Sequence, residues 1–214
     1  MIAAAQAGAP AHSVVSRIGP NAITRVAEAL RKAAMEVQLR DVFGAAGLTH
    51  YLQSPPERMV DEEEVIRLHR ALRLALGDAP AREVARAAGL ATGDYLLGHR
   101  IPKPFQAVLR RVPARVAAWL LLAAISRHAW TFAGSGSFRA RAGRPTRLSI
   151  QSNPLCRGTV AAQPLCDYYA ATFERLFRTL VHPPRQWSRP PARPAAPMPA
   201  ASRFAGRGVG PLRR

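Results

Sequence analysis

Apolar residues recur at helical spacing along most of the first 127 residues. The clearest stripe follows Asp61, where three glutamates at 62–64 favour a helix N-terminus and leucines then mark one face up to Gly77. His69 lies among arginines in this stretch, and we expect it on the solvated face of the helix. The same spacing predicts further helices over residues 20–33, 37–46, 80–97, 104–111 and 113–127.

The pattern changes after residue 128. Trp130, Phe132 and Phe138 alternate with smaller residues around a break at 134–136, and residues 147–151 alternate in the same way. This alternation predicts strands, with a turn at 143–145 between them. A last helical stripe covers residues 167–181 and has aromatic residues on its inward side. N-terminal helices, a small antiparallel sheet and a closing helix together predict an α+β fold.

The chain divides into three parts. Residues 1–16 are rich in alanine and predict a flexible arm, whereas residues 17–181 carry the periodic pattern of one folded domain. Residues 182–214 are mainly proline, arginine, alanine and glycine, which cannot bury enough apolar surface to fold, so we expect a disordered basic tail. The longest apolar run, 116–125, is about half the length that spans a bilayer and predicts a buried helix.

Charge and cysteine content narrow the function classes. The net charge of +18 favours anionic partners such as a phospholipid surface, nucleic acid or a carboxylate-bearing ligand. The sequence has no helix-turn-helix signature and no interleaved base-stacking aromatics, so we do not expect nucleic acid as a partner. Two cysteines ten residues apart do not form a disulfide framework in a chain of 214 residues, which predicts a reduced, cytoplasmic protein.

Several segments resemble those of a known family. They are HAWTFAGSGSF at 128–138, NPLCRG at 153–158 and CDYYAATFERLF at 166–177, with RIGPNAI at 17–23 near the start. Over roughly residues 17–181 the chain resembles the bacteriochlorophyll 4-vinyl reductase family, whose body is a vinyl-reductase small-molecule-binding domain. The resemblance implies a fold similar to nitric-oxide-sensor and vesicle-tethering domains. It also implies binding of a divinyl Mg-tetrapyrrole, reduction of its vinyl group to ethyl, and pairing of two copies through their helices as a homodimer.

A nicotinamide or flavin site is usually marked by a Gly-rich turn between a strand and a helix, and no such motif is evident. The glycines at 134 and 136 lack the third glycine of that motif and predict a turn. Two functions stay open within the family. The protein is either a reductase, and only in that case needs NADPH, or a pigment carrier or accessory that works with other bacteriochlorophyll-synthesis enzymes. A small-molecule-sensing regulatory or adaptor module without catalysis is the alternative outside it.

The ligand-binding candidates are two histidines and a set of aromatic residues. Neutral imidazole can ligate the metal of a Mg-tetrapyrrole while aromatic rings stack on the macrocycle, which gives the candidates His128, His99, Trp130, Phe132 and Phe138. The alternative is that His128 caps the apolar helix and the aromatics are ordinary core.

Tyr168 and Tyr169 are candidate proton donors to a reduced vinyl carbon, and Tyr169 is also placed in the ligand site. The alternative for this pair is core and rim packing.

Cys156 and Cys166 match cysteines of the family pattern and are candidate metal ligands, although two thiols supply only half of a tetrahedral zinc site. Buried thiols are the alternative. Relatives end in a strand and a Cys-containing hairpin, and a back-translation of residues 184–204 read in another frame gives AAVVETACEARGADACRF, which resembles that ending. We therefore hypothesise that the tail, 182–214, is a frameshift product.

A strip of basic residues near the middle of the chain fits the propionates of a tetrapyrrole or an acidic partner enzyme. Its members are Arg100, Lys103, Arg110 and Arg111. Solvated surface is the alternative. We therefore expect either a cytoplasmic protein or a peripheral protein on the surface of the photosynthetic membrane.

Overall fold

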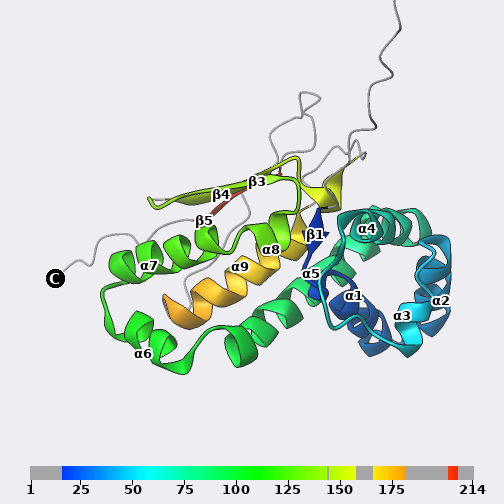
Figure 1. The fold of residues 1–214 in the computed structure, drawn as a ribbon, viewed down its shortest axis with the longest axis horizontal. Coiled ribbons are helices and arrows are strands. Elements are labelled where there is room, and N and C mark those ends of the chain that lie inside the picture. Colours follow the sequence, from blue (N-terminus) through cyan, green and yellow to red (C-terminus); the bar gives the residue numbers. More distant parts are fainter. Residues whose placement is uncertain (1–15, 144, 158–165, 182–201, 207–214) are drawn as a thin grey trace, which may run out of the picture.

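The computed structural model describes residues 16–143, 145–157, 166–181 and 202–206. Its helices and strands are shown in Figure 1. The helices are α1 (Asn21–Lys32), α2 (Glu36–Ala45), α3 (His50–Gln53), α4 (Glu62–Leu76), α5 (Asp78–Tyr95), the π-helix η1 (Leu96–Arg100), α6 (Lys103–Arg111), α7 (Ala114–Arg127), α8 (Trp130–Ala133), the 3-10 helix η2 (Pro154–Cys156) and α9 (Asp167–Leu180). The strands are β1 (Arg17–Ile18), β2 (Val60–Asp61), β3 (Ser137–Arg141), β4 (Thr146–Gln151) and β5 (Ser202–Gly206).

The arrangement is an α+β fold, as predicted. A two-stranded sheet joins β1 to β2, and a three-stranded antiparallel sheet has the order β3-β4-β5. In the larger sheet Phe138 pairs with Ile150, and Leu148 pairs with Phe204 of β5. This last strand lies within the tail that we expected to be disordered, so that expectation is wrong for residues 202–206. The remainder of the tail, residues 1–15 of the predicted arm at 1–16, and residue 144 of the predicted turn at 143–145 lie outside the described residues.

The predicted strand around residue 130 is also wrong. Residues 130–133 form the short helix α8, in which Ala133 donates its backbone N–H to the carbonyl of Ala129 at 2.8 Å. Strand β3 begins only at Ser137, after the turn. The aromatic alternation misled the prediction because both Phe132 and Phe138 face inward, although they lie on different elements.

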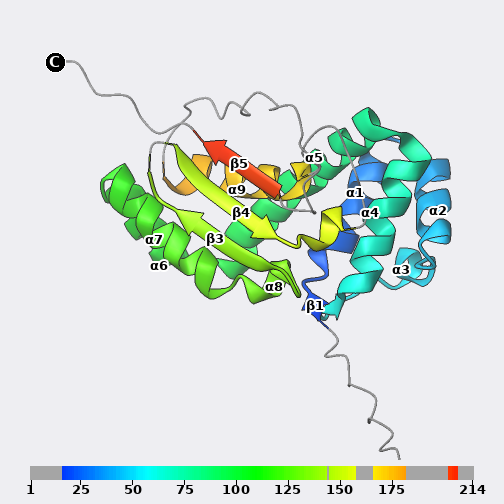
Figure 2. The same cartoon turned by 90° about the horizontal axis from the view of Figure 1, so that it is seen from above.

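Two long helices run side by side through the molecule and connect its two ends (Figures 1 and 2). Helix α5 packs on α9 with a very close approach at Gly89, where an added Cβ would clash with the carbonyl of Tyr168. Thr172 of α9 donates its hydroxyl to the Gly89 carbonyl at 3.0 Å. The glycine therefore sets the distance between these helices. Helices α1, α2 and α4 lie at one end of the pair, and α6, α7 and the larger sheet lie at the other.

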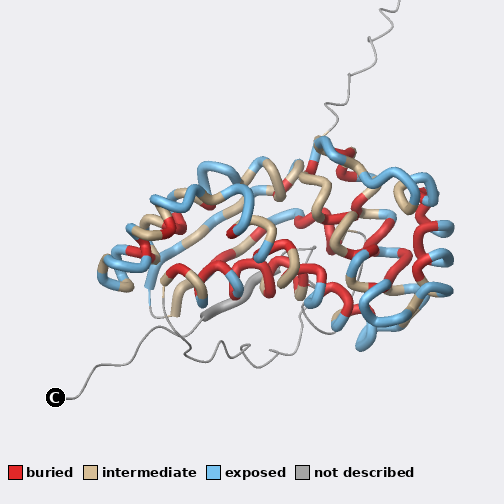
Figure 3. The backbone as a smooth tube through the Cα atoms, turned by 90° about the horizontal axis from the view of Figure 1, so that it is seen from below, coloured by how far each residue is buried: buried red, intermediate tan, exposed pale blue. Residues whose placement is uncertain are grey.

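Buried residues line the inward sides of the helices, and exposed residues line the outer sides (Figure 3). Helix α4 is an example, because Leu68 and Leu72 are buried on one of its faces. Its N-terminus is capped by the carboxylate of Asp61, which accepts the Glu63 backbone N–H at 2.9 Å. His69 belongs to this buried face. Its Nε2 lies 3.2 Å from the Ala22 carbonyl, so our placement of it on a solvated face is wrong.

Helix α7 is buried on one side only, whereas the sequence predicted a buried helix. Ala117, Leu121 and Ile125 face the core, but Val116 and Trp119 are exposed by 43% and 62%. The run is apolar all round, but within the described part of the chain the neighbouring elements cover only one of its sides. Among the described residues, no helix is both long enough and apolar enough to cross a membrane.

Candidate functional site

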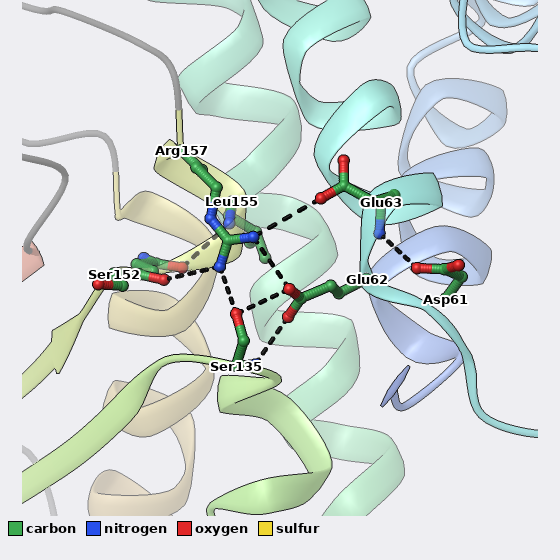
Figure 4. A network of polar contacts seen from close by, with 8 residues as sticks. Asp61, Glu62, Glu63, Ser135, Ser152, Leu155 and Arg157 are labelled. Atoms are coloured by element: carbon green, nitrogen blue, oxygen red, sulfur yellow. Dashed lines mark hydrogen bonds and ion pairs between the residues drawn. The ribbon is translucent and has the colours of Figure 1, made fainter. Parts of the chain in front are cut away.

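Three segments distant in sequence meet at the carboxylate of Glu62, the first residue of α4 (Figure 4). Its Oε2 accepts the backbone N–H of Ser135 at 2.7 Å, and its Oε1 accepts the Ser135 hydroxyl at 2.7 Å. Oε1 also accepts from Nη1 of Arg157 at 2.9 Å. The network joins α4 to the turn after α8 and to the residue that follows η2.

Glu62 is ionised at neutral pH despite its burial. Burial by itself would raise its pKa, but the hydrogen bonds from Ser135 and Arg157 outweigh burial and hold the pKa below the usual range of a glutamate. Arg157 extends the network because its Nη2 donates to the Ser135 hydroxyl and its Nη1 lies 3.6 Å from Glu63. A charged, hydrogen-bonded junction therefore fixes the turn between α8 and β3.

The turn at 134–136 is present as predicted, and its geometry requires glycine. Gly134 has a φ of +57°, and a Cβ there would clash with the Glu62 carboxylate and crowd Ile18. Gly136 closes the turn by donating its N–H to the Ala133 carbonyl at 2.8 Å. The absence of a side chain at 134 thus lets the Ser135 N–H reach Glu62.

An aromatic cluster lies next to this turn, beneath the larger sheet. Phe132 and Phe138 meet edge to face at 5.3 Å, and both contact the ring of Phe173 on α9, at 5.7 and 5.8 Å. Tyr169 joins them with its ring 5.8 Å from that of Phe132. Tyr169 and Phe173 are buried, whereas Phe132 and Phe138 are only half-buried. We call these four residues the aromatic cluster.

The hydroxyl of Tyr169 fixes the cluster to α8. It donates to the Phe132 carbonyl at 2.6 Å, and burial raises the pKa of this phenol well above its usual value. The neighbouring Tyr168 is equally enclosed, with its hydroxyl 2.8 Å from Oγ1 of Thr92, and burial raises its pKa too. Thr92 donates to the Ala88 carbonyl, so Tyr168 is the donor in its pair with Thr92. Both candidate proton donors therefore give their proton to a protein acceptor.

The structure separates the predicted ligand residues into two groups. Phe132, Phe138 and Tyr169 come together, but neither histidine shares a ring contact with them in the described part of the chain. His128 is exposed and is the C-cap of α7, with Nδ1 2.9 Å from the Ala124 carbonyl. This position agrees with the alternative that His128 caps the apolar helix. His99 of η1 is exposed and stacks on Tyr95, the last residue of α5. Trp130 is 63% exposed.

The predicted basic strip is also exposed, and several of its side chains form hydrogen bonds with groups of η1 and of α6 itself. Lys103 donates to the Leu97 carbonyl at 3.3 Å, and Arg110 reaches Gln106 at 3.2 Å. A pocket of about 310 Å³ lies away from the basic strip, between residues of α1, such as Arg25, and Tyr51, Tyr95 and residues 55–57.

Cys156 and Cys166 are buried side by side. The side-chain amide of Asn153, which is fully buried, donates to both sulfurs, at 3.3 and 3.2 Å. A hydrogen bond from Cys166 lowers the pKa of the Cys156 thiol, and the charge of Arg73 lowers it further, whereas burial acts in the opposite direction and raises it. Among the described residues no three His, Cys, Asp or Glu side chains gather in a way that would hold a metal ion. The metal-ligand role of these thiols stays a prediction.

Sequence reasoning missed the residues that organise this region. Asn153 and Arg157 flank Cys156 in one of the segments that carry the family resemblance, and this proximity was the available signal. Glu62 was noted only as one of three acids at a helix start. Its partner Arg157 is 95 residues away in sequence, so no local pattern indicates the pair.

No protein-family model matches the chain. It is 43% identical over 176 residues to the bacteriochlorophyll synthase 23 kDa chain of Cereibacter sphaeroides, an alignment that covers 82% of this chain and 83% of that protein. The protein of the same name from Rhodobacter capsulatus is 43% identical over 167 residues, covering 78% of this chain and 76% of its own length. At this identity and coverage, the chain belongs to the family of the bacteriochlorophyll synthase 23 kDa chain.

Proposed function

We propose that this protein acts in bacteriochlorophyll biosynthesis by binding a divinyl Mg-tetrapyrrole at the aromatic cluster, as a pigment carrier or accessory protein. The names of its relatives support the pathway, which is also the one that the sequence resemblance implied. They also support work beside other proteins of that pathway. The single observation that carries the choice of ligand is the aromatic cluster, with two half-buried phenylalanine rings on two different elements.

A flat, apolar macrocycle is bound best by rings that already face it. Phe132 on α8 and Phe138 on β3 keep part of their surface exposed, while Phe173 supports both from below. Stacking against such rings adds roughly 0.5–1.5 kcal/mol for each aromatic pair beyond the burial of apolar area. The site is preorganised because the Glu62 junction fixes the turn between the two phenylalanines.

The tyrosines favour a carrier over a catalyst. Reduction of a vinyl group needs a proton at the second carbon, and a phenol could supply it only with its hydroxyl directed at the substrate. The hydroxyls of Tyr168 and Tyr169 instead point to protein acceptors. Their raised pKa values also make both phenols weaker acids, which supports a role in holding the helices and the cluster in place.

The test is a titration of the purified protein with a Mg-divinyl pigment, followed by absorbance and fluorescence, with and without NADPH. We expect a binding shift without conversion to the monovinyl spectrum. Conversion in the presence of NADPH would identify a reductase instead, and no binding to a folded sample would refute the pigment site.

Matched variants locate the pigment. Phe138→Ala removes one half-buried ring of the cluster and should weaken pigment binding by about tenfold. Leu74→Ala removes an exposed apolar side chain of α4 and is the control, with no expected effect. Equal affinities of the two variants would place the pigment elsewhere on the protein.

A further inference from the structure

Within residues 1–181, the net charge is confined to one stretch. Residues 1–94 hold eleven bases and eleven acids, and residues 167–181 hold two of each. Residues 95–166 hold eleven bases and no acid. The helices α6 and α7 and the β3–β4 hairpin come from this stretch, and they lie at the end of the molecule opposite α2 and α3 (Figures 1 and 2). One end is therefore basic and the other is neutral.

The basic side chains of this end point to solvent. Nine of them are exposed, namely Arg100, Lys103, Arg110, Arg111, Arg115, Arg127, Arg139, Arg141 and Arg147. In the hairpin, Arg141 lies directly opposite Arg147 across the strands. Like charges in this position repel one another, and the stretch contains no acid that could separate them. An anionic partner would relieve this repulsion.

The exposed side of α7 adds apolar side chains to the same end. Val116, Trp119 and Ala123 are exposed, and their spacing places them on one side of the helix. The exposed Arg115 and Arg127 border that side, and the exposed Trp130 follows the helix C-terminus. We call these six residues the α7 face.

We propose that the α7 face docks on the surface of an anionic phospholipid bilayer. Tryptophan is favoured at the level of lipid headgroups, and arginines beside it pair with lipid phosphates. The opposite side of α7 is committed to the protein core through Leu121 and Ile125, so the helix lies in the plane of the interface with only its outer side chains inserted.

A second copy of the chain fits this face less well. A symmetric dimer brings the same patch of both subunits together, which would place Arg115 and Arg127 against the arginines of the other copy. The acid-free stretch supplies no carboxylate to pair with them. Charge complementarity therefore selects the anionic bilayer, and a protein dimer becomes an outcome of the test.

The test is co-sedimentation of the full chain with vesicles of phosphatidylcholine alone and with vesicles that also contain phosphatidylglycerol. We expect binding only to the anionic vesicles, weakening as salt is added. The variant Arg115→Glu with Arg127→Glu should bind them at least about 25-fold more weakly, since each arginine near such a surface contributes about fivefold.

A matched control separates the α7 face from net charge. Arg40→Glu with Arg70→Glu makes the same charge change on exposed residues of α2 and α4 and should keep most of the binding. The seven arginines after residue 181 are present in every variant and cancel in the comparison. An equal loss in both double variants, or no binding of the unaltered chain at low salt, would overturn the proposal.

The apolar contribution has its own pair of variants. Trp119→Ser should weaken binding to anionic vesicles, whereas Leu74→Ser, at the 77% exposed leucine of α4, should not. Thermal unfolding confirms that each variant is folded. If Trp119→Ser instead converts a dimer to a monomer and leaves vesicle binding unchanged, the face is an interface between copies and the proposal is wrong.

Discussion

Replacing Gly134 by alanine tests whether the turn at 134–136 is built around the Glu62 carboxylate. The backbone there has a φ of +57° and a ψ of −127°, a conformation outside the left-handed helical region that costs alanine at least about 1–2 kcal/mol. The new Cβ also clashes with Glu62, and pushing the Ser135 donors away from a buried carboxylate costs a further ~1–3 kcal/mol. We expect a loss of about 2–5 kcal/mol in the free energy of unfolding, or a fall in Tm of about 10 °C.

Gly47→Ala is the matched control, because Gly47 has a similar φ of +70° but open space around it. It should lose only the backbone contribution, about 1–2 kcal/mol. Urea titration and thermal unfolding followed by circular dichroism measure both variants. In a Glu62→Ala background the cost of Gly134→Ala should fall to its backbone contribution, because no carboxylate is left for the new Cβ to meet. Equal losses for the two glycine variants in the unaltered background would refute the clash with Glu62.

Three further predictions concern buried polar groups. Burial lowers the pKa of His69 to about 3. Between about pH 6.5 and 3 the imidazole is therefore protonated in the unfolded chain but not in the folded one. The free energy of unfolding should fall as the pH is lowered through this window. His69→Gln should flatten that part of the Tm–pH curve, and an unchanged curve would contradict the assignment. Tyr169→Phe leaves the Phe132 carbonyl without its donor and should cost about 1–3 kcal/mol in urea titration, whereas a loss within error would show that the bond contributes nothing. Asn153→Ala truncates a fully buried side chain and leaves space beside Cys156 and Cys166, so both thiols should react faster with a thiol reagent in the native protein. An unchanged rate would show that Asn153 does not shield the thiols.

Local physics was enough to predict most helices from the sequence. Helix α4 is the best example, because an aspartate cap, three acids in the first turn and a leucine stripe all act within the helix itself. The closing helix α9 was predicted for the same reason, and its inward aromatics, Tyr169 and Phe173, do form part of the aromatic cluster.

The failures share a dependence on distant partners. His69 is buried because distant elements contact it, through the Ala22 carbonyl of α1 and the Tyr168 ring of α9, and the arginines beside it gave no sign of those contacts. Strand β5 exists through its pairing with β4, more than 50 residues earlier in the chain. The Glu62–Arg157 pair likewise depends on the tertiary fold. For α7, the sequence established an apolar helix but not which side its neighbours would cover.

The pairing of α5 with α9 has a consequence for how the chain is made. Residue 95 ends α5, and its partner helix begins at residue 167, so about 70 residues must be synthesised before the two can meet. At roughly 5–20 residues per second this takes about 4–14 s. During that interval the side of α5 that contains Gly89 cannot yet pack on α9, and in the nascent chain it is accessible to chaperones. Packing of α9 on α5 then buries that side in the core.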